Sequence, residues 1–171
     1  MKIQFFLIYA FVVLVFIPLK TSAQYKDFSL SANYFPSLNP HRDFGLQANM
    51  HFGDERARLN LGGEFRTALW GNQLTSQLGY LRLVKNGNLS FGAGGDLNLG
   101  VALFVNRPML VIGTTGYLMV QQTIGKRLFA RSTLGLRYAN CPGYSDYSQF
   151  SNTLEADFRL GMGVRLGKEL E

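Results

Sequence analysis

From about residue 26 onward, apolar and polar residues alternate along the chain with a period of two. In residues 43–52, Phe, Leu, Ala, Met and Phe occupy the even positions, and Asp, Gly, Gln, Asn and His occupy the odd ones. Residues 89–100 and 154–167 show the same alternation. A strand with one apolar and one polar face has this period, whereas a helix would need a period of 3.6 residues. The pattern therefore predicts an all-β chain.

Eight strands are predicted in this way. They cover residues 26–35, 43–53, 57–70, 75–85, 88–105, 109–124, 127–139 and 152–167. The second, fourth and sixth strands are followed by the short polar turns GDER, KNGN and GKR, which are typical of hairpins between antiparallel neighbours. The first and seventh are followed by the longer segments 36–42 and 140–151. An even number of strands with this order of connections predicts an up-and-down transmembrane barrel with short periplasmic turns and longer outer loops.

In two of these strands the pattern leaves the choice of faces open. Neither alternate set of residues 75–85 is clearly the polar one, and residues 109–124 are apolar on both faces as far as Gln121.

The charged residues indicate which face of the barrel is inside. After residue 23 the lysines stand at strand ends or turns, while the polar face carries six arginines and six carboxylates. These are Arg58, Arg66, Arg131, Arg137, Arg159, Arg165, Asp27, Asp43, Glu64, Asp96, Glu155 and Asp157. A confined interior favours such balance, because an unpaired charge behind a protein wall costs several kcal/mol. We therefore predict a lumen filled by a charge network and an apolar face in lipid. Eight strands also leave no room for a permanent open pore.

The first 23 residues predict an export signal. Lys2 precedes the apolar run of residues 5–19, and the small residues Thr21, Ser22 and Ala23 follow Lys20. The run is 15 residues long, shorter than the roughly 20 that a membrane-spanning helix needs. We expect a signal peptide at residues 1–23, cleaved after Ala23, and a single β-barrel domain at residues 24–171. An uncleaved anchor is the alternative interpretation.

The composition argues against several kinds of site and partner. Charged residues make up only 16% of the chain, and its single cysteine, Cys141, excludes an internal disulfide. No Cys and His cluster has the spacing of a metal site, so neither a metal nor another cofactor is predicted. The basic residues are scattered singly along an exported chain, which argues against a nucleic-acid partner.

Together, the leader, the eight strands, the alternating connections and a last strand that ends in GMGVRLGK resemble the small outer-membrane β-barrel proteins of Gram-negative bacteria. The resemblance covers nearly all of the chain after residue 23. It implies an outer-membrane location, contact with outer-membrane lipid, and delivery by the outer-membrane insertion machinery. The chain departs from these proteins at its end, because Leu166 is followed by Gly, Lys, Glu, Leu and Glu rather than by a final aromatic residue.

Two functions remain open within that resemblance. We expect a structural or interaction protein, not an enzyme, that uses its outer loops. The aromatic residues Tyr144, Tyr147 and Phe150 are candidates for recognising an extracellular or envelope protein, a peptide or a glycan. They are equally suited to lie at the lipid headgroups.

Some resembling barrels act on lipid A or cleave peptides, so a lipid-modifying enzyme at the outer rim is the first alternative. It would use His41 with Asp43 and a loop serine, although the sequence has no GxSxG motif. His51 lies on the polar face, where a lumen hydrogen bond is the simpler interpretation. A soluble periplasmic ligand-binding barrel is the second alternative, and it requires the apolar face to turn inward.

Overall fold

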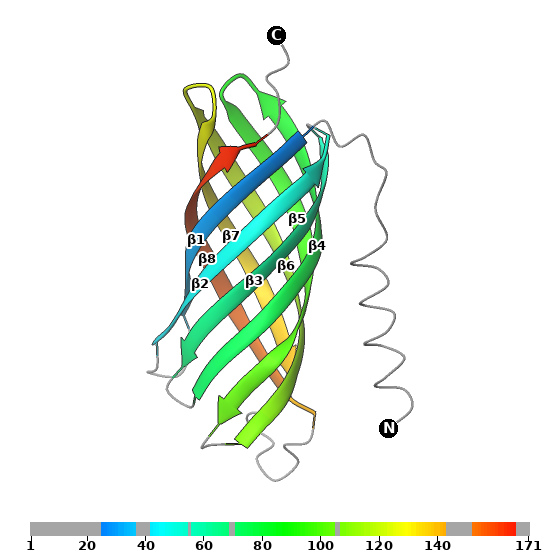
Figure 1. Ribbon diagram of the computed structural model, residues 1–171, viewed down its shortest axis with the longest axis vertical. Helices are drawn as coiled ribbons and strands as arrows, with labels where there is room; N and C mark the ends of the chain where they lie inside the picture. Colours follow the sequence, from blue (N-terminus) through cyan, green and yellow to red (C-terminus); the bar gives the residue numbers. More distant parts are fainter. Residues whose placement is uncertain are drawn as a thin grey trace.

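Eight antiparallel strands run through the part of the chain that the structure, a computed structural model, describes (Figure 1). The described residues are 25–36, 42–54, 56–68, 71–104, 107–142 and 152–166. The strands are β1 (Tyr25–Pro36), β2 (Arg42–Gly53), β3 (Ala57–Ala68), β4 (Gly71–Asn86), β5 (Leu89–Phe104), β6 (Arg107–Ile124), β7 (Leu128–Asn140) and β8 (Asn152–Arg165). None of these residues belongs to a helix long and apolar enough to cross a membrane. The predicted signal peptide lies outside the described residues.

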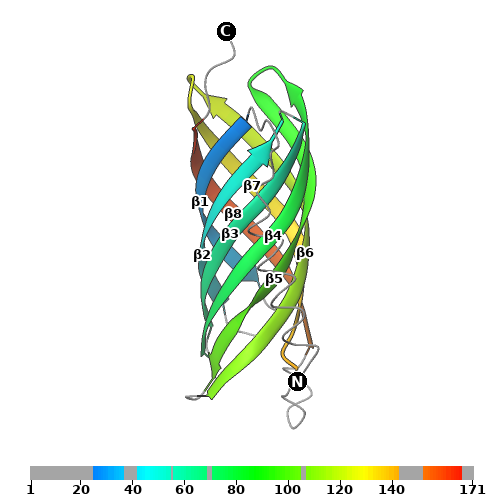
Figure 2. The ribbon, with the colours of Figure 1, turned by 45° about the vertical axis from the view of Figure 1, so that its right-hand side comes forward.

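The strands close into a barrel. Each strand pairs with its neighbours in sequence, and β1 also pairs with β8, from Asp27 opposite Arg165 to Tyr34 opposite Phe158. Figures 1 and 2 show the tilted strands wrapped around a long cylinder. Closure leaves no sheet edge with unpaired N–H and C=O groups, and such groups would each cost several kcal/mol in a hydrocarbon environment. The predicted up-and-down topology is confirmed.

The start of β1, the end of β8 and three short turns lie at one end of the cylinder, which we call the turn end (Figure 1). Gly87 and Gly125 have φ values of 61° and 66°, the left-handed conformation that tight turns require and glycine adopts readily. In the turn after β2, the Asp54 carboxylate accepts hydrogen bonds from the amides of Arg56 and Ala57, at 2.7 and 2.5 Å. These two bonds hold the pKa of Asp54 below its usual value.

Backbone hydrogen bonds also tie the turns to more distant strands. The carbonyl of Arg56 accepts from the amide of Leu83 on β4, and the carbonyl of Arg127 accepts from the amide of Arg165 on β8. Similar bonds join Asn88 to Thr123, and Lys26 to Leu166. The turn end is therefore a continuous hydrogen-bonded rim.

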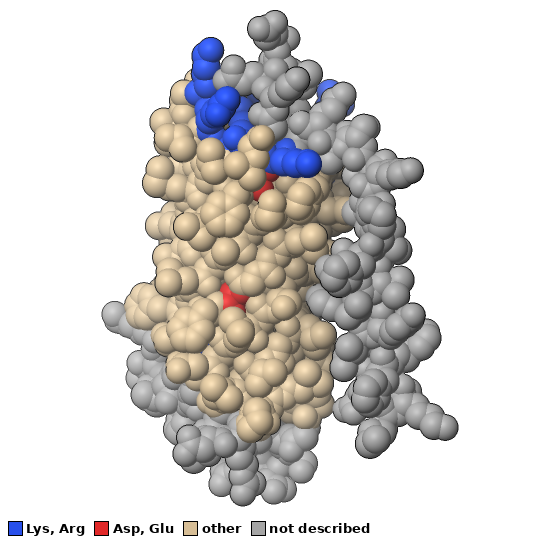
Figure 3. Space-filling view, viewed as in Figure 1, with Lys and Arg blue, Asp and Glu red and all other residues tan. Residues whose placement is uncertain are grey.

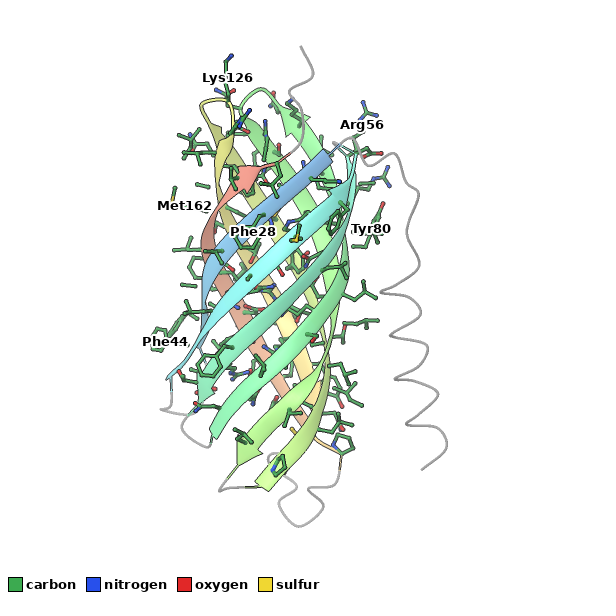
Figure 4. All side chains as sticks on the ribbon, viewed as in Figure 1. Phe28, Phe44, Arg56, Tyr80, Lys126 and Met162 are labelled. Carbon is green, nitrogen blue, oxygen red and sulfur yellow. The ribbon has the colours of Figure 1, made fainter. Side chains whose placement is uncertain are left out.

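The outer surface of the cylinder is apolar between its two ends. Alternate residues of every strand point outward, and the side chain of Leu97 in the middle of β5 is 65% exposed. Other exposed apolar residues include Leu30, Leu46, Leu74, Val101, Leu118, Leu134, Leu136, Leu154, Leu160 and Met162. Outward aromatic side chains lie toward the ends, with Phe28 and Tyr80 near the turn end and Phe44 near the other end (Figure 4).

The structure resolves the two ambiguous strands and changes some boundaries. Strand β4 begins at Gly71, four residues before the predicted start, because residues 71–74 pair with both β3 and β5. The third and last strands end at Ala68 and Arg165, each two residues earlier than predicted. In β4 and β6 the odd-numbered residues face the interior.

That register places apolar side chains inside the barrel, near the turn end. Leu81, Leu83 and Met119 are buried there and pack with Tyr117. The lumen is therefore not wholly polar, which explains why alternation failed to identify the inner face of these two strands.

Glycine on the inner face lets neighbouring groups approach closely. At Gly135 on β7, an added Cβ would lie 2.5 Å from the carbonyl oxygen of Gly116 and 2.8 Å from the Cβ of Tyr117. At Gly116 on the outer face of β6, an added Cβ would meet nothing within 4 Å. Inner glycines are thus required by packing, whereas this outer glycine is not.

We expect Gly135→Ala to lower the free energy of unfolding by about 1–3 kcal/mol, because backbone cannot move out of the way of the new methyl group. Gly116→Ala is the matched control and should be neutral or slightly stabilising. Urea unfolding of the barrel in detergent micelles measures both. Equal effects of the two substitutions would contradict the packing argument.

Candidate functional site: the charged lumen

The alternation of the strands brings all twelve predicted lumen charges to the inner face. Nine of them are buried, and Arg131, Glu155 and Arg165 are partly buried. The six guanidinium groups and six carboxylates are contributed by β1, β2, β3, β5, β7 and β8. Their pairs are distributed along the whole length of the cylinder.

At the end opposite the turns, Arg66 joins two carboxylates. Its Nη1 and Nη2 donate to Glu155 at 2.8 and 3.1 Å, and Nη2 also pairs with Asp43. The guanidinium carbon lies 4.2 Å from the ring centroid of Phe35, which is fully buried, and Arg137 lies over the same ring at 5.4 Å. Phe35 and two arginines therefore fill this end of the lumen.

The next level is centred on Glu64. Its carboxylate pairs with Arg137 and accepts hydrogen bonds from Asn33 and Gln77, at 3.2 and 3.1 Å. Gln47 contacts both Asn33 and Gln77. Because every partner comes from a different strand, Glu64 links β1, β3, β4 and β7 across the interior.

The middle of the lumen is organised by Arg159. It pairs with Asp157 on its own strand and with Asp96 of β5, whose Oδ2 lies 3.3 Å from Nη1. Asp96 also accepts a hydrogen bond from Asn60 at 2.9 Å, and the Tyr117 hydroxyl lies 3.4 Å from its Oδ1. The Tyr117 ring stacks near the Arg159 guanidinium, with 5.4 Å from carbon to centroid.

Nearest the turns, the carboxylate of Asp27 lies close to several basic side chains. Its Oδ2 lies 2.7 Å from Arg58, and its Oδ1 lies 2.6 Å from Nδ1 of His51 and 3.9 Å from Arg131. Arg131 Nη1 lies 2.9 Å from Nε2 of His51. An arginine can only donate, so His51 accepts at Nε2 and carries its proton on Nδ1, the atom that lies next to Asp27. His51 thus forms the lumen hydrogen bond that its position predicted.

Little free volume is left between these groups. A cavity of about 20 Å³ lies among Ser29, Asn49, His51, Asn60 and Arg131, enough for one water molecule. Small-molecule pockets have volumes of roughly 300 Å³ or more. The arrangement therefore fits an interior that braces the wall and does not fit one that holds a small ligand.

Three inward aromatic residues were not foreseen from the sequence. Phe35, Tyr117 and Phe129 each lie under a guanidinium group, the last with Arg131 at 5.0 Å. Their position in the alternation is the signal that could have predicted an inward orientation. Phe35 belongs to the same alternate set as Asn33, and Phe129 belongs to the same set as Arg131. An apolar ring on a polar face is the pattern that such stacking leaves in a sequence.

Arg165, the last predicted lumen residue, donates to the Thr123 hydroxyl at 2.7 Å. The loop residues Tyr144, Tyr147 and Phe150, and His41 of the rim-enzyme alternative, lie outside the described residues. Within the residues that are described, no group of three His, Cys, Asp or Glu side chains is placed to hold a metal ion.

Removing one member of the Arg137–Glu64 pair should destabilise the barrel strongly. We expect Arg137→Met to lower the free energy of unfolding by about 3–5 kcal/mol, because Glu64 is left buried without its charge partner. The double variant Arg137→Met with Glu64→Gln should recover part of that loss. Urea unfolding in micelles gives the values, and a double variant that is less stable than Arg137→Met alone would contradict this account.

Comparison with known proteins shows which solved structures have a similar fold. No family model matches the chain, and no curated protein matches it by sequence. Among solved structures, the N-terminal β-barrel domain of OprF from Pseudomonas aeruginosa is similar, with a TM-score of 0.57, 10% identity, and coverage of 82% of this chain and 97% of that one. Neisserial surface protein A, NspA, is similar with a TM-score of 0.53, 13% identity, and coverage of 84% and 96%. The fold of this chain is thus that of the small outer-membrane β-barrels which its sequence resembles.

Proposed function

We propose that this chain is a non-enzymatic outer-membrane β-barrel that presents its longer connections, residues 36–42 and 140–151, to a partner outside the cell. In this proposal residues 1–23 direct export, the outer-membrane insertion machinery assembles the barrel, and the partner is a protein, a peptide or a glycan. Tyr144, Tyr147 and Phe150 are the proposed recognition residues.

The observation that carries the membrane location is the separation of side chains by the wall. Leucine, phenylalanine and methionine cover the outside, and paired charges fill the inside. A water-soluble ligand-binding barrel needs the reverse arrangement, with an apolar cavity inside and a charged exterior. Strands of 12 to 18 residues are also longer than the 9–11 or so that a tilted strand needs to cross a bilayer.

The filled lumen supports a structural or interaction role over transport. The interior is blocked at three levels, by Phe35 with two arginines, by Tyr117 with Arg159, and by Phe129 with Arg131. A solute would have to displace each of these, together with the ion pairs around it. The parts of the chain left to act are the connections at the two ends.

The orientation follows from the lengths of the connections. Short turns are typical of the periplasmic end of such barrels, and longer loops of the outer end. The turn end of this barrel therefore faces the periplasm in the proposed arrangement, and the connection between β7 and β8 faces outward.

Arginine introduced on the outer face should destabilise the barrel according to its depth in the bilayer. Leu97 lies in the middle of β5, and Leu103 lies one residue before its end. We expect Leu97→Arg to cost about 2–4 kcal/mol and Leu103→Arg about 0–1 kcal/mol, because only the first places a charge at the bilayer midplane.

Reversible urea unfolding in phosphatidylcholine vesicles is the measurement. The two variants share the strand, the face and the chemical change, so a difference between them reports depth alone. If Leu97→Arg were as mild as Leu103→Arg, the outer face would not lie in lipid.

The orientation can be tested with single cysteines in a Cys141→Ser background. Pro142→Cys places a thiol at an exposed position just after β7, and Lys126→Cys places one in the turn after β6. In intact cells a membrane-impermeant maleimide should label Pro142→Cys but label Lys126→Cys only after the outer membrane is permeabilised. The reverse order of labelling would invert the orientation, and recovery of the protein in a soluble periplasmic fraction would end the proposal.

A further inference from the structure

Six exposed basic side chains surround the barrel at its turn end. They are Lys26, Arg56, Arg82, Lys85, Lys126 and Arg127, and we call them the basic ring. Figure 3 shows Lys and Arg gathered at this end, above a broad surface of other residues. Among the side chains that the structure describes, no exposed Lys or Arg stands at the opposite end.

Among the described residues, the turn end carries these six exposed basic side chains and one exposed carboxylate, Asp54. Six of the described carboxylates face the lumen, where they are matched by six inward arginines. Asp54 is the described carboxylate exposed at the turn end, and its Oδ1 is occupied by two backbone amides of its own turn. When the neighbouring sequence positions Glu55, Lys168, Glu169 and Glu171 are included, basic residues outnumber acidic ones by seven to four in these segments of the sequence.

Two members of the ring lie on the outward rows of the strands. Lys26 lies two residues before Phe28 and opposite Phe52, and Arg82 lies two residues beyond Tyr80. In a strand tilted by 45°, two residues correspond to about 5 Å along the barrel axis. The charges thus stand one step beyond the outward aromatic residues, which in membrane barrels lie at the headgroups. Long, flexible stems let lysine and arginine reach into that layer.

Backbone hydrogen bonds of the rim tie three members of the ring to neighbouring strands. The backbone carbonyls of Lys26, Arg56 and Arg127 accept hydrogen bonds from Leu166, Leu83 and Arg165. In Figure 4, Arg56 and Lys126 stand on separate turns of this end. The basic groups therefore come from several strands and turns around the barrel and not from one loop.

We infer that the basic ring binds the anionic headgroups of phospholipids that surround the turn end of the barrel. The ring runs around the outer circumference and borders the apolar surface, so a surrounding leaflet can contact all of it. A soluble partner docked on one side would contact only part of it. Basic residues next to an anionic leaflet are attracted to its headgroups. This inference rests on the proposed membrane location of the barrel.

The test measures lipid preference of the full-length protein after folding into phosphatidylcholine vesicles. Spin-labelled phosphatidylglycerol and spin-labelled phosphatidylcholine are added separately, and the fraction of each immobilised against the barrel is read by electron paramagnetic resonance. We expect a several-fold preference for phosphatidylglycerol that falls as salt rises from about 50 mM to about 1 M, because salt screens exposed charges.

Two variants separate charge from structure. Lys26→Gln, Arg56→Gln, Arg82→Gln and Arg127→Gln combined leave Lys85 and Lys126 as the remaining ring residues and should lower the preference strongly. The charge-conserving set Lys26→Arg, Arg56→Lys, Arg82→Lys and Arg127→Lys should keep it. The inference is overturned by equal binding of the two lipids to the unaltered protein, by a preference that salt does not change, or by loss of the preference in both variants. Failure of the unaltered protein to insert into phosphatidylcholine would instead refute the proposed membrane location.

Discussion

The pairing of arginine with carboxylate inside the cylinder is the interaction on which the rest of this structure depends. A closed sheet whose outer face is apolar has to direct its polar residues inward, where an unpaired charge costs several kcal/mol. The pairs that result connect distant strands, because Arg66 of β3 reaches Glu155 of β8, Arg137 of β7 reaches Glu64 of β3, and Arg159 of β8 reaches Asp96 of β5. They act as cross-links through the centre, while the backbone ladder holds the circumference.

The architecture could be predicted from the sequence because one physical rule, a period of two, governs nearly every strand. The prediction was weakest at β4 and β6, where Leu81, Leu83 and Met119 turn inward and make both faces apolar. Leu81 and Leu83 of β4 pack in the lumen with Tyr117 and Met119 of β6, and alternation within one strand does not contain that information.

The lumen was harder to predict than the wall. Alternation assigns a side chain to a face, but its partner depends on the register between strands and on the stagger that closes the barrel. Arg66 and Glu155, for example, are separated by 89 positions in sequence and meet only because β1 pairs with β8. The stacking of Phe35 beneath two guanidinium groups has the same origin. Alternation thus predicts the face on which a charged side chain lies, and the three-dimensional closure determines how the charges are matched.

The ladder between β7 and β8 continues up to the pair formed by Asn140 and Asn152, so the two ends of the connection they bound are already neighbours. On the lumen side of that pair, the guanidinium group of Arg66 lies over the Phe35 ring and fills the interior. We therefore expect the barrel to stay closed when the length and composition of this segment change. In the proposed orientation, it is a suitable place to graft foreign peptides for display at the surface of a cell.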